Sequence, residues 1–174
     1  MEEVIATAPQ DHNVLSLDLG TNCGWAVARN AVIEYSGVKS FYSKDAHPGL
    51  RFMKLHNWLL KFRGVDEIFI EDVVQPFMSS ASARVYCGML AIVQLFCLTN
   101  NIKLSGIKPT AVKKLFTGKG RASKTEVCNI CIGLGWANGK YDTDRNNDEA
   151  DACAVYYAMM KKRGRDVTFS SNAE

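Results

Sequence analysis

The segment Val14–Val27, with the sequence VLSLDLGTNCGWAV, limits the fold more than any other part of the chain. Four of its first six residues are apolar, which predicts a buried β-strand ending in a tight turn at Gly20-Thr21-Asn22. A second short strand is predicted over Trp25–Ala28. Asp18 interrupts the apolar run, and a buried carboxylate is costly unless a cation compensates its charge. The alternative is a solvated aspartate that caps the turn, and Asp18 alone does not decide between the two.

The rest of the chain alternates between strand and helix patterns. A third strand is predicted over Ala31–Phe41, and apolar residues then follow helical spacing from Leu50 to Phe62. Two further strands are expected at Glu67–Asp72 and Ile102–Ile107. The other predicted helices are Ser79–Thr99, a short one opened by Lys108-Pro109-Thr110, Ser123–Leu134 and Asp148–Lys162. This order predicts an α/β fold with a mixed, five-stranded central sheet flanked by helices.

The length of 174 residues, 47% of them hydrophobic and 22% charged, suits one domain with a substantial core. We expect that core over about residues 13–163 of the single domain 1–174, between a loose N-terminal leader and a frayed tail from Gly164 to Glu174. The leader is polar and carries two early glutamates, unlike a signal peptide. A cytoplasmic protein, and not a secreted one, is therefore expected.

Six cysteines in a reducing compartment do not indicate a disulfide framework. Cys128 and Cys131 have the spacing of half a zinc site, but no second Cys or His pair follows at ligand spacing. Both cysteines also lie on one face of an apolar helical pattern. Buried thiols are therefore the favoured interpretation of this pair.

Three more carboxylates occur where they could meet Asp18. Glu71 ends a predicted strand, and Asp148 and Asp151 are three residues apart on one face at the start of the last helix. Each has a simpler role on its own, as a solvated strand end, an N-cap or a partner of the helix dipole. Together they predict a metal site of oxygen ligands, without His or thiol ligands, that suits Mg²⁺ or Mn²⁺.

The basic residues are separated from this acidic cluster. No acidic residue occurs between Ile107 and Lys124, a strip that contains Lys108, Lys113, Lys114, Lys119, Arg121 and Lys124. The net charge of +3 is too small to indicate a polyanionic partner by itself. An acidic cluster beside a basic strip can nevertheless hold a divalent metal ion next to a phosphate backbone.

The segment Val85–Thr99 is almost continuously apolar and is interrupted mainly by Gln94. It is shorter than the about 20 apolar residues that a membrane span needs, so no membrane partner is expected. A helix that is apolar on every side must be covered on two sides. We expect the sheet on one side and the same helix of a second chain on the other, with Met89 and Ile92 on that outer side, which makes a homodimer. The alternative is a monomer in which the later helices cover it.

The motifs resemble, in their order, those of the RuvC family of Holliday-junction resolvases, which have the RNase H-like nuclease fold. The resemblance extends roughly from Val14 to Lys161. The segments that carry it are Leu17-Asp18-Leu19-Gly20 at the first-strand aspartate, Ile70-Glu71 at the fourth-strand glutamate, the basic segments Val112-Lys113-Lys114 and Ala122–Val127, and the terminal D-x-x-D-A at Asp148–Ala152. No single segment is specific, but five in the family's order over most of the chain are strong support.

The resemblance implies an endonuclease that resolves four-way DNA junctions with paired cuts by a homodimer. Asp18, Glu71, Asp148 and Asp151 would hold two Mg²⁺ or Mn²⁺ ions, with Asp18 between them. Lys124 corresponds to the lysine placed near the scissile phosphate. The other residues that would bind DNA are Lys113, Lys114, Lys119, Arg121 and Phe77.

Two positions depart from the family's pattern. The cellular enzymes have an aromatic residue three positions after the strand-four glutamate, where this chain has Val74. Phe77 is the nearest aromatic residue, after an apparent insertion around Gln75-Pro76. The first turn is Leu-Gly-Thr instead of Pro-Gly. These departures indicate a divergent branch, and a viral protein that acts in the host cytoplasm is one explanation.

Three other functions fit parts of the pattern. A less selective nuclease that cuts flaps, Y-junctions and replication forks would need the same residues. Asp-x-Gly-Thr also opens the phosphate loop of actin-like and hexokinase-like ATPases, but these need a second phosphate loop and a second domain. A non-catalytic DNA-binding subunit would have no reason to keep four converging acids that repel phosphate.

Overall fold

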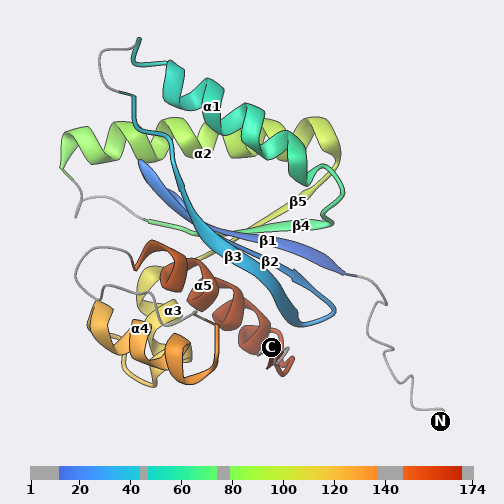
Figure 1. Cartoon of the computed structure of the whole chain (residues 1–174), viewed down its shortest axis with the longest axis vertical. Coiled ribbons are helices and arrows are strands. Elements are labelled where there is room, and N and C mark those ends of the chain that lie inside the picture. The colour runs from blue at the N-terminus through green and yellow to red at the C-terminus, as the bar shows by residue number, and fades with distance from the viewer. Residues whose placement is uncertain (1–11, 44–46, 74–78, 137–146, 170–174) are drawn as a thin grey trace.

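The computed structural model describes residues 12–43, 47–73, 79–136 and 147–169. Within these residues a mixed sheet lies between two layers of helices (Figure 1). Its strands are β1 (Asn13–Asp18), β2 (Asn22–Arg29), β3 (Val32–Ser40), β4 (Glu67–Glu71), β5 (Lys103–Ile107) and β6 (Thr168–Phe169). The helices are α1 (Leu50–Leu59), continued by the 3₁₀ turn η1 (Leu60–Phe62), α2 (Ser80–Asn100), α3 (Pro109–Thr117), α4 (Lys124–Gly133) and α5 (Asp148–Lys162).

The sheet has the strand order β5-β4-β1-β2-β3-β6. β1, β2 and β3 form an antiparallel meander, whereas β1, β4 and β5 run parallel to one another. The predicted mixed α/β sheet is therefore confirmed. Parallel neighbours end at the same edge, and Leu17 pairs with Ile70, so the ends of β1 and β4 lie side by side.

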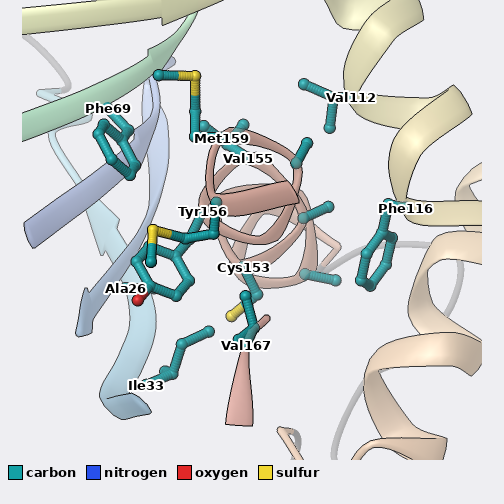
Figure 2. Close-up of a cluster of buried hydrophobic side chains, with 14 of the residues drawn as sticks. Ala26, Ile33, Phe69, Val112, Phe116, Cys153, Val155, Tyr156, Met159 and Val167 are labelled. Carbon is teal, nitrogen blue, oxygen red and sulfur yellow. The ribbon is translucent and has the colours of Figure 1, made fainter. Parts of the chain in front are cut away.

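Alternation along β1 and β4 divides their side chains between the two helical layers. Leu15 and Leu17 face α1 and α2, together with Ile68 and Ile70. Phe69 faces α5, where its ring stacks on Tyr156 with centroids 6.1 Å apart (Figure 2). By the same period of two, the carboxylates at the ends of β1 and β4 also belong to the α5 side.

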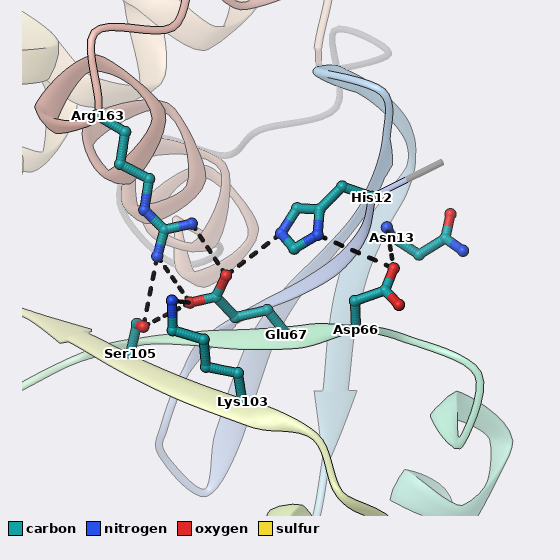
Figure 3. A network of polar contacts seen from close by, with 7 residues as sticks. All are labelled: His12, Asn13, Asp66, Glu67, Lys103, Ser105 and Arg163. Atoms are coloured by element: carbon teal, nitrogen blue, oxygen red, sulfur yellow. Dashed lines mark hydrogen bonds and ion pairs between the residues drawn. The ribbon is translucent and has the colours of Figure 1, made fainter. Parts of the chain in front are cut away.

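A buried glutamate at the other end of β4 fixes the end of α5 (Figure 3). Glu67 is only 1% exposed and accepts two hydrogen bonds from Arg163, at 2.9 and 2.7 Å. Ser105 also donates to it, and His12 and Lys103 lie within 4 Å. Burial alone would raise the pKa of Glu67, but these hydrogen bonds and charges hold it at about 2. Arg163 follows α5 directly, so the contact sets the position of the helix that carries Asp148 and Asp151.

The C-terminal residues differ from expectation. Instead of a frayed tail, Thr168 and Phe169 form β6, which pairs in parallel with Val32 and Ile33 of β3. Val167 is 9% exposed and belongs to the core between the sheet and α5. The prediction of a tail from Gly164 onward was wrong for residues 164–169, because backbone pairing with β3 orders a polar segment that has no apolar pattern of its own.

The cysteine pair behaves as predicted. Cys128 and Cys131 are completely buried in the core below the sheet, as free thiols. Burial raises the pKa of both thiols, and the nearby cysteines and acids raise that of Cys131 further. Neutral, inert thiols follow from this setting.

Helix α2 has the predicted length, but its hydropathy and its outer face differ from expectation. Its 21 residues, with a mean hydropathy of 1.6 over 18 of them, are long and apolar enough to cross a membrane, so the expectation that its apolar segment is too short was wrong. One such helix is weak support for a membrane span, because the core helix of a soluble protein has the same length and composition. Met89, expected on the outer side, is fully buried against the sheet. Ile92 is half-buried.

Candidate active site

Asp18 and Glu71 meet at one edge of the sheet because β1 and β4 are parallel neighbours in register. Both side chains are partly buried on the α5 side. Tyr86 of α2 fixes the end of β4 from the opposite layer. Its hydroxyl donates to the Glu71 carbonyl at 2.9 Å and accepts from the Val73 N–H at 3.1 Å.

Asp148 and Asp151 come to the same edge at the start of α5. The Ser16 hydroxyl in the middle of β1 donates to the Ala152 carbonyl at 2.7 Å, which joins the first turn of α5 to β1. Gly24 lies directly opposite Asp18 in the β1–β2 pairing. A Cβ at Gly24 would overlap the backbone carbonyl of Asp148, so only glycine allows α5 to approach this closely.

Electrostatics shows that the four carboxylates interact. Burial raises the pKa of Asp18 well above its usual range. Asp151, Glu71 and Asp148 raise it further, in that order, and Lys124 opposes them. Like charges in a desolvated setting disfavour ionisation, so a cation that binds between these groups would relieve the repulsion.

The pKa values of the three carboxyl groups near Asp18 are also raised. Burial and the charge of Asp151 raise the pKa of Glu71 to about 7, against the opposing charges of Lys113 and Lys124. Burial also raises the pKa of Asp151 to about 6 and that of Asp148 by a smaller amount, with Lys124 again opposing. Perturbed carboxyl groups in such a cluster are typical of functional sites.

The donor set fits a hard divalent cation, because it consists of carboxylate oxygens alone. Among the residues that the structure describes, no three His, Cys, Asp or Glu side chains stand close enough together to hold a metal ion as they are. The charges of the four acids act on one another, but in this structure the acids do not form an assembled ligand sphere.

Two of the predicted lysines lie beside the acids. Lys124, the first residue of α4, lowers the pKa of all four carboxyl groups by its charge, and its Nζ donates to Oδ1 of Asn147 at 3.3 Å. Lys113 of α3 lowers the pKa of Glu71 and Asp151. The basic strip thus borders the acidic cluster, as the charge separation in the sequence indicated.

Three other predicted DNA-binding residues are exposed on the surface. Lys114 and Arg121 are exposed. Lys119 is also exposed, but its Nζ pairs with Glu126 at 2.9 Å, a surface contact too weak to prevent exchange for a phosphate. Phe77 and Val74 lie outside the described residues, so the structure does not locate the predicted junction-opening aromatic side chain.

A cavity of about 420 Å³ lies between the β1–β2 turn and α2, in the layer opposite α5, and none of the four acids lines it. One wall is the β1–β2 turn at Leu19-Gly20-Thr21, directly after Asp18. The other wall is the start of α2, including Ser82, Val85 and Tyr86.

Three residues of this site were missed by the sequence analysis. Gly24 carried a signal, since a glycine inside a strand often marks a close backbone approach. Tyr86 was counted only as part of an apolar helix. Asn147 was not considered, because nothing in the sequence indicates that it meets Lys124.

Comparison with known proteins connects this chain to a family, although no family model matches it. The crossover junction endodeoxyribonuclease RuvC of Rickettsia conorii is 32% identical over 144 residues, which cover 79% of this chain and 88% of that protein. RuvC of Rickettsia typhi is 30% identical over 160 residues, 84% of this chain and 96% of that protein. The chain belongs to the RuvC family. The resemblance inferred from the sequence is therefore confirmed.

Solved structures of RuvC and of another Holliday junction resolvase share the fold. Thermus thermophilus RuvC superposes with a TM-score of 0.67 at 21% identity, covering 87% of this chain and 96% of that chain. The same enzyme in complex with a Holliday junction substrate gives 0.66, covering 84% and 92%. The yeast mitochondrial resolvase Ydc2 gives 0.68 at 14% identity, covering 91% and 82%. The expected RNase H-like resolvase fold is thus confirmed.

Proposed function

We propose that this protein is a DNA endonuclease that resolves four-way junctions. The observation that carries the proposal is the convergence of Asp18, Glu71, Asp148 and Asp151 on one sheet edge in a chain of the RuvC family. Three separate elements supply these acids, and Asp151, Glu71 and Asp148 each raise the pKa of Asp18. A structural role does not require such repulsion, whereas a cation-dependent reaction on a phosphate does.

Asp18, Glu71, Asp148 and Asp151 would hold two Mg²⁺ or Mn²⁺ ions. When bound, such ions would activate a water molecule and stabilise the leaving oxygen of a phosphodiester. The protein itself orients the acids through the β1–β4 pairing, the Ser16–Ala152 hydrogen bond and the approach at Gly24. Lys124 would offset the negative charge that develops on the phosphate during hydrolysis.

The basic strip would hold the rest of the DNA. Lys113 faces the acids, and the exposed Lys114, Lys119 and Arg121 extend the positive surface away from them. Lysine and arginine contacts with the phosphate backbone position a duplex without specifying its sequence. Recognition of branch shape is therefore expected to exceed recognition of bases.

A homodimer would supply the second active site that paired cuts require. The face of α2 that points away from the sheet carries an exposed apolar stripe at helical spacing, formed by Cys87, Ala91, Leu95 and Leu98. Leu95 is 53% exposed and Leu98 is 80% exposed, which is unusual for leucines without a partner. A two-fold axis along this stripe would bury it against its own copy.

Cleavage of defined DNA substrates tests the proposal. The protein is incubated in Mg²⁺ with labelled four-way, Y-form and linear duplex DNA of matched sequence, and the cut positions are mapped on each strand. We expect symmetrically paired cuts in the four-way junction and little cleavage of the duplex. Equal cleavage of Y-forms and flaps would support the broader debranching nuclease instead. No cleavage of any branched substrate in Mg²⁺ or Mn²⁺ would refute both.

A further inference from the structure

Asn147 is a buried residue at the start of α5 whose side chain does not cap the helix. It is 6% exposed and occupies the N-cap of α5. Asparagine is preferred there because its side-chain oxygen can accept a hydrogen bond from the first helical turn. Here the backbone is already helical, with φ −89° and ψ −3°, and the side chain makes no capping bond. Its Oδ1 accepts instead from Nζ of Lys124.

Lys124 is also at a position that local structure does not favour. It is the first residue of α4, where the helix dipole disfavours a cation. The start of α4 is already satisfied, because Ser123 and Glu126 form a complete capping box. The contact between Lys124 and Asn147 therefore caps neither α4 nor α5.

The orientation of the amide follows from its partner. A lysine ammonium group only donates, so the atom that faces Lys124 is the oxygen of Asn147. The amide nitrogen, Nδ2, is buried and has no hydrogen-bond partner in the described part of the chain. An unpaired buried donor destabilises a fold, and an apolar side chain of similar size would avoid this. Within the described residues, no hydrogen bond of Nδ2 accounts for an asparagine at this position.

The amide of Asn147 is uncharged, which distinguishes it from a carboxylate as a partner of Lys124. None of the ion pairs among the described residues includes Lys124, although its charge acts on all four carboxyl groups. A carboxylate partner would neutralise the lysine, and an unrestrained side chain would pair with the nearest acid. A neutral acceptor holds the ammonium group without using its charge.

We propose that Asn147 is a positioning residue that holds Lys124 beside the acids, with its charge available for the scissile phosphate. The contact also joins the starts of α4 and α5, so it keeps the lysine and the Asp148–Asp151 pair in a constant relation. This inference rests on the proposed nuclease function.

A double-mutant cycle tests it, with Asn147→Leu, Lys124→Met and the double variant. We expect Asn147→Leu to lower the single-turnover cleavage rate of a four-way junction about tenfold. Junction affinity without divalent metal should stay within about twofold, because the positive charge remains. The melting temperature should be unchanged or higher, since an unpaired buried donor is removed. In the Lys124→Met background, Asn147→Leu should change the rate less than about twofold.

The results of this experiment distinguish a failure of the role proposed for Asn147 from a failure of the proposed nuclease function. Wild-type protein that cuts no branched DNA would refute the proposed function, and this inference with it. Wild-type cleavage combined with equal rate losses from Asn147→Leu in both backgrounds would overturn the inference alone. So would an unchanged rate, or a loss of rate that accompanies a lower melting temperature.

Discussion

Gly24 lies opposite Asp18 in the sheet, and the first residue of α5 passes directly over it. The atoms that a side chain would meet belong to the Asp148 backbone, which cannot rotate away as a flexible side chain can. The position of one acid therefore depends on the absence of a side chain on another strand. At the scale of single residues, the site is built as much by Gly24 as by its carboxylates.

Gly24→Ala should displace the start of α5 and separate Asp148 from Asp18. We expect a loss of about 1–3 kcal/mol in the free energy of unfolding, as for other overpacked sites, and a lower cleavage rate. Chemical denaturation and single-turnover kinetics measure the two effects. Gly133→Ala is the matched control, because a Cβ there meets nothing within 4 Å. Wild-type stability and rate in Gly24→Ala would show that α5 does not depend on this approach.

Glu67 gives the fold a specific dependence on pH. Its pKa is about 2 in the folded protein and near 4.5 in the unfolded chain, so the unfolded state binds more protons between these values. The stabilisation is therefore complete above pH 4.5 and is lost as pH falls towards 2, by about 3 kcal/mol in total. Urea unfolding at several pH values should show a shallower dependence for Glu67→Gln. The exposed Glu34 provides the control Glu34→Gln, and equal pH dependence in the two variants would contradict this account.

The helices and the strands β1 to β5 could be predicted because each carries its own local pattern. The two apolar strands with terminal acids, β1 (Asn13–Asp18) and β4 (Glu67–Glu71), are the clearest case. β6 could not be predicted, since Thr168 and Phe169 are ordered only by pairing with β3. The face of α2 was assigned wrongly because a helix that is apolar all round has no periodic signal to distinguish Met89 from Leu98.

The same limit applies to the candidate site. The four acids could be predicted because their residue type and order along the chain are informative without a structure. Gly24, Tyr86 and Asn147 act through contacts with distant segments, and such contacts leave no local pattern. Sequence reasoning therefore found the charged groups but not the residues that hold them.

At the scale of elements, the exposed stripe of α2 predicts how the dimer can be separated. Leu95→Lys combined with Leu98→Lys places two charges on the stripe, and both positions are exposed, so each chain should still fold. In sedimentation at micromolar concentration we expect the wild type at the mass of two 19.3 kDa chains and the double variant at the mass of one. Tyr35→Lys, at an exposed aromatic residue of β3, should leave the dimer intact. A wild-type monomer that still makes paired cuts would contradict the proposed assembly.

At the scale of the whole molecule, the sheet separates two tasks. The acids and the basic strip lie on the layer of α3, α4 and α5, whereas the exposed apolar stripe belongs to α2 in the opposite layer (Figure 1). The end of β4 connects them, because Glu71 contributes its carboxylate to the site and its carbonyl to Tyr86 of α2. Chemistry and assembly can therefore be tested by separate substitutions.

Cleavage of a four-way junction by Asp18→Asn tests the central claim most directly. The substitution keeps the shape of the side chain and removes one of the four mutually repelling charges, so the fold and junction binding should persist. We predict that the single-turnover rate in Mg²⁺ falls by at least about a thousandfold. Asp166→Asn, which removes an exposed aspartate at 89% exposure, should cut at the wild-type rate. Cleavage by purified Asp18→Asn at the wild-type rate would contradict the assignment of these four carboxylates as the active site.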